Sequence, residues 1–79
     1  MNSNKYIIYP NPSKTNFIIG GNINQIIKIE IFDMNNHCVY YQNINPSDCS
    51  LNLEFLNSGM YIYKITENDY SQTGKLVLD

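Results

Sequence analysis

Residues 56–65, LNSGMYIYKI, combine a turn with the start of a strand, and the rest of the chain is interpreted outward from them. The segment before Met60 is rich in turn-forming residues, and its glycine, Gly59, takes backbone conformations that cost other residues energy. From Met60 onward, β-branched and aromatic residues dominate, as is typical of a strand. Side chains alternate across a strand, so odd and even positions face opposite sides. We expect the core face to carry Tyr61, Tyr63 and Ile65 and the partly exposed face to carry Met60, Ile62 and Lys64.

Short apolar runs with strand character recur on both sides of this stretch. We expect strands over residues 6–9, 15–19, 26–33, 37–42, 51–55, 60–65 and 73–78. Gly20 and Gly21 are predicted to close the second strand, and residues 43–50 to form a loop. Because no stretch has helical periodicity, the chain is predicted to be all-β: a small antiparallel sandwich of about seven strands. We expect a single domain over residues 1–79, in which residues 1–5 are flexible or extraneous.

Composition excludes several function classes. The 79 residues carry a formal net charge of −2, with no arginine. A nucleic-acid surface needs clustered Lys and Arg, so nucleic acid is excluded as a partner. No apolar run approaches the roughly 20 residues of a membrane-spanning helix, and residues 1–4 lack the features of a secretory signal. Taken alone, this suggests a cytoplasmic protein, but a domain cut from a larger exported protein would have the same sequence.

Residues suited to catalysis or metal binding are few. His37 and Cys38 are neighbours on a predicted strand, so their side chains point to opposite faces and make a poor nucleophile–base pair. Together with Cys49 they lack the paired spacings of zinc sites. The two cysteines are more readily interpreted as free, partly buried thiols, with a disulfide as the alternative. Glu67 and Asp69 lie in one predicted turn, but without EF-hand spacing they are interpreted as solvated. We therefore expect no catalytic residue, no cofactor and no metal.

The seven tyrosines suggest an alternative function. Aromatic rings on a sheet face stack on sugars or peptides, which would make the domain a carbohydrate-binding or adhesion module of a surface protein. This alternative requires exposed rings gathered on one face. The positions concerned are Tyr6, Tyr9, Tyr40, Tyr41, Tyr61 and Tyr63. Packing in the core or at a sheet edge is the competing interpretation of the same residues.

Several motifs, taken in order, resemble those of a known family. Residues 9–12, YPNP, open the domain, and residues 29–33, IEIFD, lead into a turn. Residues 58–65, SGMYIYKI, and the terminal residues 73–78, TGKLVL, follow. In order, spacing and position against the C-terminus, the chain resembles the type A C-terminal sorting domain of the type IX (Por) secretion system, over about residues 6–78. The resemblance implies an immunoglobulin-like, seven-stranded sandwich.

The resemblance also implies that the domain catalyses nothing and acts as an address. Such domains end exported proteins of Gram-negative bacteria and direct them to the outer-membrane translocon, after which a sortase-like peptidase usually removes the domain. The expected partners are the type IX translocon, the sortase-like peptidase and a cargo fused on the N-terminal side. The expected location is secreted or at the cell surface, reached through the periplasm. We expect a monomer or a weak dimer formed through strand edges.

Residues that match the family's motifs are the candidate recognition or shape residues. They are Pro10, Asn11, Pro12, Asp33, Gly59, Tyr61, Lys64, Lys75, Leu76, Val77 and Leu78. The corner at Pro10 and the turn at Gly59 are expected to fix shape. The exposed part of the last strand is the expected docking surface, because an edge strand offers unpaired N–H and C=O groups. The chain departs from the family's pattern at Asn36, where glycine is usual, and at Asp79, where the end is often basic.

Overall fold

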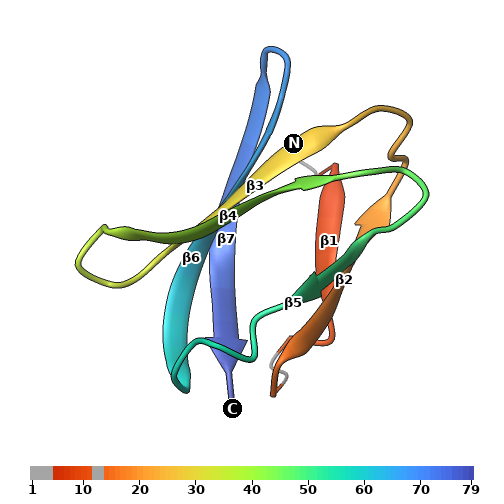
Figure 1. Ribbon diagram of the computed structural model, residues 1–79. Coiled ribbons are helices and arrows are strands. Elements are labelled where there is room, and N and C mark those ends of the chain that lie inside the picture. The colour runs from red at the N-terminus through yellow and green to blue at the C-terminus, as the bar shows by residue number, and fades with distance from the viewer. Residues whose placement is uncertain (1–4, 12–13) are drawn as a thin grey trace.

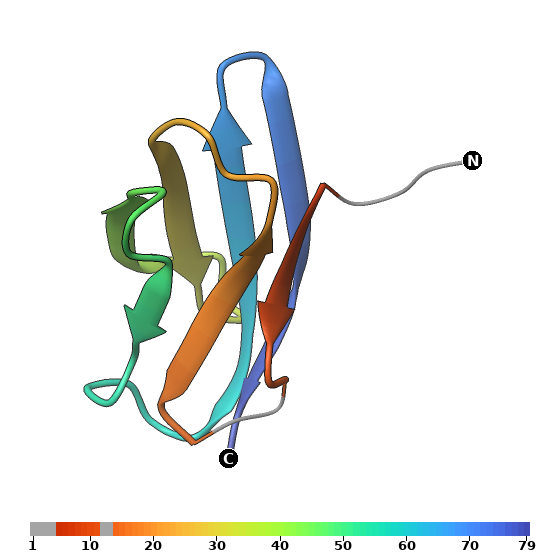
Figure 2. The same cartoon turned by 90° about the vertical axis from the view of Figure 1, so that its right-hand side faces the viewer.

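The alternating sequence folds into two antiparallel sheets that face each other in a computed structural model describing residues 5–11 and 14–79 (Figures 1 and 2). One sheet has the order β1-β2-β5 and contains β1 (Tyr6–Tyr9), β2 (Asn16–Gly21) and β5 (Ser50–Asn52). The other has the order β4-β3-β6-β7 and contains β3 (Ile27–Phe32), β4 (Cys38–Ile44), β6 (Gly59–Glu67) and β7 (Tyr70–Leu78). The described residues form seven strands and no helix, so the predicted sandwich is confirmed.

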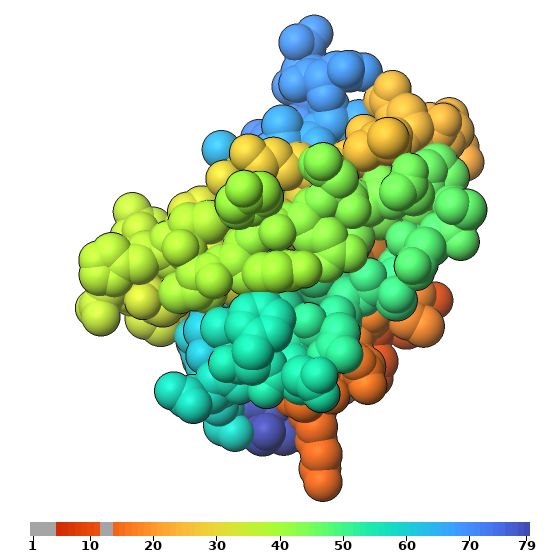
Figure 3. Space-filling model, in the orientation of Figure 1, coloured from red at the N-terminus to blue at the C-terminus, as the bar shows by residue number. Residues whose placement is uncertain are grey.

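The strand order is immunoglobulin-like apart from the position of β4. In a constant-type immunoglobulin domain the fourth strand joins the sheet of the first, second and fifth. Here β4 pairs with β3 in the other sheet. Figure 3 shows β4 crossing the front of the molecule, with the tip of the β6–β7 hairpin projecting above it. A bulge between Ile31 and Phe32 leaves Val39 without a ladder partner, a common device near the end of a paired strand.

Alternation determines which side chains fill the space between the sheets. Tyr61, Tyr63 and Ile65 of β6 are buried as predicted, whereas the even positions of that strand remain at least partly exposed. Burial of such apolar surface is the dominant favourable term in folding. The core consists of Tyr6, Ile8, Phe17, Ile19, Ile27, Ile29, Ile31, Ile44, Leu51, Leu53, Tyr61, Tyr63, Ile65, Leu76 and Leu78.

Two segments that were predicted to connect strands belong to strands, wholly or in part. Gly20 and Gly21 belong to β2, opposite Ile7 and Tyr6 of β1. A Cβ on Gly21 would lie 2.7 Å from the carbonyl oxygen of Lys5, so glycine here permits close backbone approach rather than a turn. The predicted loop 43–50 is also wrong at its start, because β4 continues to the fully buried Ile44.

The last hairpin is longer than predicted, and the fifth strand is shorter. Strands β6 and β7 reach Glu67 and Tyr70, so only Asn68 and Asp69 turn the chain, and Asn68 takes a positive φ of 50°. Strand β5 ends at Asn52, and beyond it Phe55 is 56% exposed.

Candidate recognition site

Most of the predicted recognition residues lie at one end of the molecule, around the C-terminal half of β7. In the β6–β7 ladder, Gly59 is opposite Leu78 and Tyr61 is opposite Leu76. The corner that follows β1 lies beside the same half of β7, near the C-terminus in Figure 2. The fold therefore brings together motifs from the beginning, middle and end of the chain.

Two predicted residues do not join this group, and a third cannot be assigned to it. Asp33 follows β3 in the β3–β4 hairpin, which projects to the left in Figure 1. Lys64 lies in the middle of the outer face of the four-stranded sheet, opposite Glu30 on β3 and Thr73 on β7. Pro12 lies outside the described residues.

The residues of the last strand divide between two faces. Leu76 and Leu78 are buried in the core, so a partner cannot contact their side chains while the domain is folded. Lys75 is exposed and Val77 is half-buried on the outer face, beside Ile62 and Met60 respectively. The expected docking surface therefore comprises the outer side chains of β7 and its free backbone edge.

Asn11 binds that free edge through its side-chain amide. Its Nδ2 donates to the carbonyl oxygen of Lys75 at 2.9 Å, and its Oδ1 accepts from the N–H of Val77 at 3.1 Å. These two backbone groups flank Leu76 and point away from β6. In a parallel pair of strands, one residue bonds in this manner to the residues before and after its opposite. The amide thus occupies the position of one residue of a neighbouring parallel strand.

A second amide, that of Gln72 on β7, binds the free edge of β1. Its Nε2 donates to the carbonyl oxygen of Tyr6 at 2.7 Å, and its Oε1 accepts from the N–H of the same residue at 3.0 Å. The amide also donates to the hydroxyl of Tyr63 and accepts from that of Tyr70. Gln72 is 5% exposed, so this amide has its hydrogen-bonding capacity satisfied inside the protein. Sequence analysis did not single out Gln72.

Glu67 ends β6 beside this contact and is 8% exposed. Its carboxylate accepts from Lys5 Nζ at 2.8 Å, from the hydroxyl of Tyr6 at 2.5 Å and from Gln25 Nε2 at 2.5 Å. These donors, Lys5 first, lower the pKa of Glu67 to about 2. Burial, followed by the bond to Glu67, raises the pKa of Tyr6 to about 12.

The interpretation of Glu67 as a solvated turn residue is wrong. Its position continues the inward alternation of Tyr61, Tyr63 and Ile65, and this was the available signal for its burial. Lys5, in the segment expected to be flexible, is held by Glu67 and by the bond from its own N–H to the hydroxyl of Tyr70 at 3.0 Å.

Three further motif residues have contacts or backbone conformations that are local to their own segment. Gly59 has a φ of 149°, which favours glycine, although no atom lies within 4 Å of where its Cβ would be. The hydroxyl of Tyr61 donates to the carbonyl of Asn57 at 2.7 Å. Asp33 Oδ1 accepts from the N–H groups of His37 and Asn35, and these bonds, His37 first, lower the pKa of Asp33.

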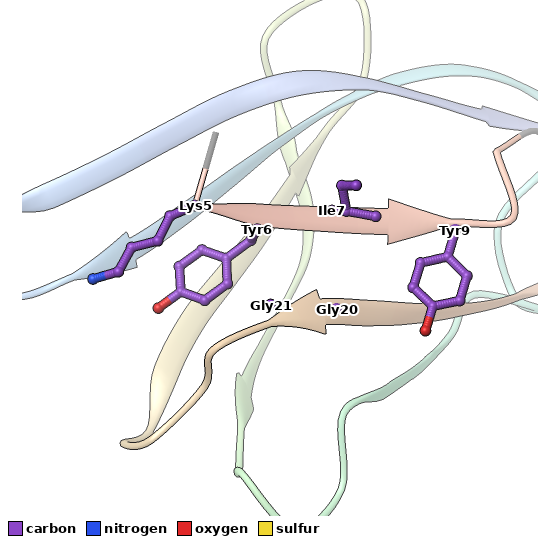
Figure 4. A pocket seen from close by; sticks show the side chains of 6 residues that line it. All are labelled: Lys5, Tyr6, Ile7, Tyr9, Gly20 and Gly21. Atoms are coloured by element: carbon purple, nitrogen blue, oxygen red, sulfur yellow. The ribbon is translucent and has the colours of Figure 1, made fainter. Parts of the chain in front are cut away.

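The tyrosines do not form the exposed cluster that a sugar-binding face requires. Tyr6, Tyr61 and Tyr63 are buried. Tyr9 and Tyr41 are 47% and 68% exposed, but they belong to β1 and β4 of different sheets. A groove of about 240 Å³ beside β1 is lined by Lys5, Tyr6, Ile7, Tyr9, Gly20 and Gly21 (Figure 4). It presents one exposed aromatic ring, which stands over Gly20.

The residues considered for chemistry are dispersed. His37 Nδ1 lies 3.4 Å from Asp33 Oδ2 in an exposed turn. Cys38 and Cys49 are free thiols, and Cys38 is exposed, so the prediction of partial burial holds for Cys49 alone. Within residues 5–11 and 14–79, no three His, Cys, Asp or Glu side chains gather to hold a metal ion. The same residues form no helix able to cross a membrane.

Two facing antiparallel sheets of three and four strands place the chain in the class of small β-sandwich domains. Residues 7–79 match the family described as the secretion system C-terminal sorting domain, and the chain belongs to this family of type IX secretion. It is also 36% identical over 63 residues to the ulvan lyase NLR42 of Nonlabens ulvanivorans. The matched segment covers 78% of this chain and 12% of that protein's length.

Proposed function

We propose that this chain is the sorting signal at the C-terminal end of an exported protein. The family match, which spans nearly the whole folded unit, carries the proposal. The similarity to 12% of a longer protein named as a lyase supports a division of labour, in which any catalysis belongs to a cargo and none to this chain. The cargo is fused on the N-terminal side, and the exported protein reaches the surface or exterior of a Gram-negative bacterium through the periplasm.

The proposed partners are the outer-membrane type IX translocon and the sortase-like peptidase that removes the domain. Pro10, Asp33, Gly59 and Tyr61 serve the folded shape, and the anchoring of β7 in the core supports the same role for Leu76 and Leu78. The exposed outer side and edge of β7 are the surface that the translocon contacts. Recognition thus requires the folded domain rather than an extended tail.

A fusion experiment tests the proposal. A reporter preceded by an export signal and followed by residues 1–79 is expressed in a bacterium that has the type IX system. We expect the reporter outside the cell, and we expect a matched fusion without residues 1–79 to stay in the periplasm. Retention of an intact, protease-resistant fusion in the periplasm would contradict the proposed function.

A further inference from the structure

We propose that the free edge of β7 binds an extended segment of the secretion machinery as an added parallel strand, and that Asn11 is a latch occupying its place until the segment arrives. The inference rests on the proposed function and names the recognition mode. The side-chain amide of Asn11 makes one donor and one acceptor bond with Lys75 and Val77, the two bonds that one residue of such a strand would make.

The register of β7 shows which backbone groups are available. The backbone N–H and C=O of one strand residue point to the same side, and successive residues alternate. Since Lys75 C=O and Val77 N–H meet Asn11 and not β6, the odd-numbered residues from Ser71 to Val77 direct their backbone groups to the edge. For the N–H of Lys75, the described part of the chain offers no partner. This N–H and its neighbours are a template for strand addition.

The surroundings of the edge indicate the partner's chemistry. On the outer face an added strand would lie beside the exposed Lys75 and the half-buried Val77. Cross-strand pairing favours an acidic side chain next to the first and an apolar side chain next to the second. The occupant is therefore an extended peptide segment with a free backbone and an acidic–apolar pattern.

The latch is built to be released. Asn11 is exposed, and both of its bonds on β7 lie at the protein surface, so water replaces them when the amide leaves. Hydrogen bonds exchanged for water in this way have a small net free energy. An incoming strand makes the same two bonds and adds others along the edge, so it displaces the latch.

A pair of substitutions at Lys75 tests the backbone interaction in the reporter fusion. Lys75→Pro removes the edge-facing N–H at a position where an edge strand tolerates proline, whereas Lys75→Ala keeps it. With both variants shown to be folded by circular dichroism, we expect at least a tenfold loss of export for Lys75→Pro and near wild-type export for Lys75→Ala, because an exposed ion pair contributes little. Normal export of folded Lys75→Pro, or loss for Lys75→Ala, would overturn the strand-addition proposal.

Asn11→Ala tests the latch, and it also tests the strand-addition proposal if Lys75→Pro fails to fold. Freed from competition, the edge should bind its partner more tightly, and export should become about two- to fivefold faster when the translocon is limiting. The control is Asn22→Ala, which changes an exposed asparagine of the β2–β3 connection and should leave the rate unchanged. A folded Asn11→Ala that is exported at the same rate or more slowly, or that dimerises in light scattering, overturns the proposal. If the unmodified fusion is not exported, the proposed function itself has failed.

Discussion

Two side-chain amides close neighbouring strand edges in this domain, and they differ in their surroundings. Gln72 joins β7 to the edge of β1 from inside the protein, where its amide makes four hydrogen bonds. Asn11 joins the corner after β1 to the edge of β7 at the opposite end, on the surface, with two. The same chemical group thus performs a similar task in a dry environment and in a wet one.

The difference between Gln72 and Asn11 determines how firmly each contact holds. A buried backbone group that loses its partner keeps the full desolvation penalty, whereas an exposed one is hydrated. Glu67 strengthens the buried end further, because its carboxylate binds the hydroxyl of Tyr6 and the ammonium group of Lys5. We therefore regard the Gln72 end as a permanent fastening and the Asn11 end as an exchangeable one.

The largest effect is expected at the permanent fastening. Gln72→Leu leaves the buried N–H and C=O of Tyr6 without partners and should lower the free energy of unfolding by about 3 kcal/mol. Urea denaturation followed by tyrosine fluorescence measures the change. Thr73→Leu, one residue along on the exposed face, is the control and should change stability by less than about 0.5 kcal/mol. A similarly small loss for Gln72→Leu would show that this contact is as exchangeable as that of Asn11.

A steric change next to the same fastening should have the next largest effect. A Cβ at Gly74 would lie 2.6 Å from the ring of Tyr63, whose hydroxyl accepts from Gln72. Gly74→Ala should therefore destabilise the domain by roughly 1–3 kcal/mol through overpacking. Repeating it in a Tyr63→Leu background, which removes the ring, should abolish most of this loss in a double-mutant cycle. If the stability losses of Gly74→Ala and Tyr63→Leu are additive, the strain does not arise from contact with the ring of Tyr63.

The pH dependence of stability should distinguish the Gln72 end of the domain from the Asn11 end. The pKa of Glu67 is lowered from 4.5 to about 2, so its stabilisation is complete above about pH 4.5 and is lost as the pH falls toward 2. The pKa of Tyr6 is raised from 10.0 to about 12, so its contribution is complete below about pH 10 and is lost as the pH rises toward 12. Thermal unfolding across pH measures both limbs. Glu67→Gln should flatten the acid limb and Tyr6→Phe the alkaline limb, whereas Asn11→Ala should alter neither.

The smallest effect on stability is expected at the exchangeable fastening. Asn11→Ala removes two exposed hydrogen bonds and should lower the free energy of unfolding by about 0.5–1 kcal/mol. Hydrogen exchange gives a more local measurement, since the N–H of Val77 should lose protection while that of Leu76, which faces β6, keeps it. A stability loss above about 2 kcal/mol would contradict the division into permanent and exchangeable ends.

Alternation was sufficient to predict the sandwich and the inward face of the central strand, Tyr61, Tyr63 and Ile65, because each Ile or Tyr at an inward position reports its own burial. It failed where the inward residue is charged. Glu67 occupies an inward position, but its burial depends on donors from Lys5, Tyr6 and Gln25, which only the folded chain brings together. The prediction of a turn at Gly20 likewise overlooked the close contact with β1 that glycine permits.

The two amide contacts were beyond prediction for a different reason. Gln72 has the inward parity of Leu76 and Leu78, which signals burial as at Glu67 but does not indicate its partner. Asn11 lies in a corner, where asparagine is frequent and commonly binds only water. Each meets a partner more than 60 positions away in the sequence. The family resemblance drew attention to Asn11 and to the last strand separately, and the structure joined them.

The placement of Lys5 determines where a protein fused on the N-terminal side lies relative to β7. The chain enters the domain at Lys5, beside Glu67, whereas Asn11 and the C-terminal half of β7 lie at the other end (Figure 2). A passenger tethered ahead of Lys5 therefore joins the domain near Tyr70, at the Ser71 end of the β7 edge, and away from the Lys75 and Val77 groups that Asn11 binds. If the edge at Lys75 and Val77 is the docking surface, as we propose, the size of an attached passenger should have little influence on access to it.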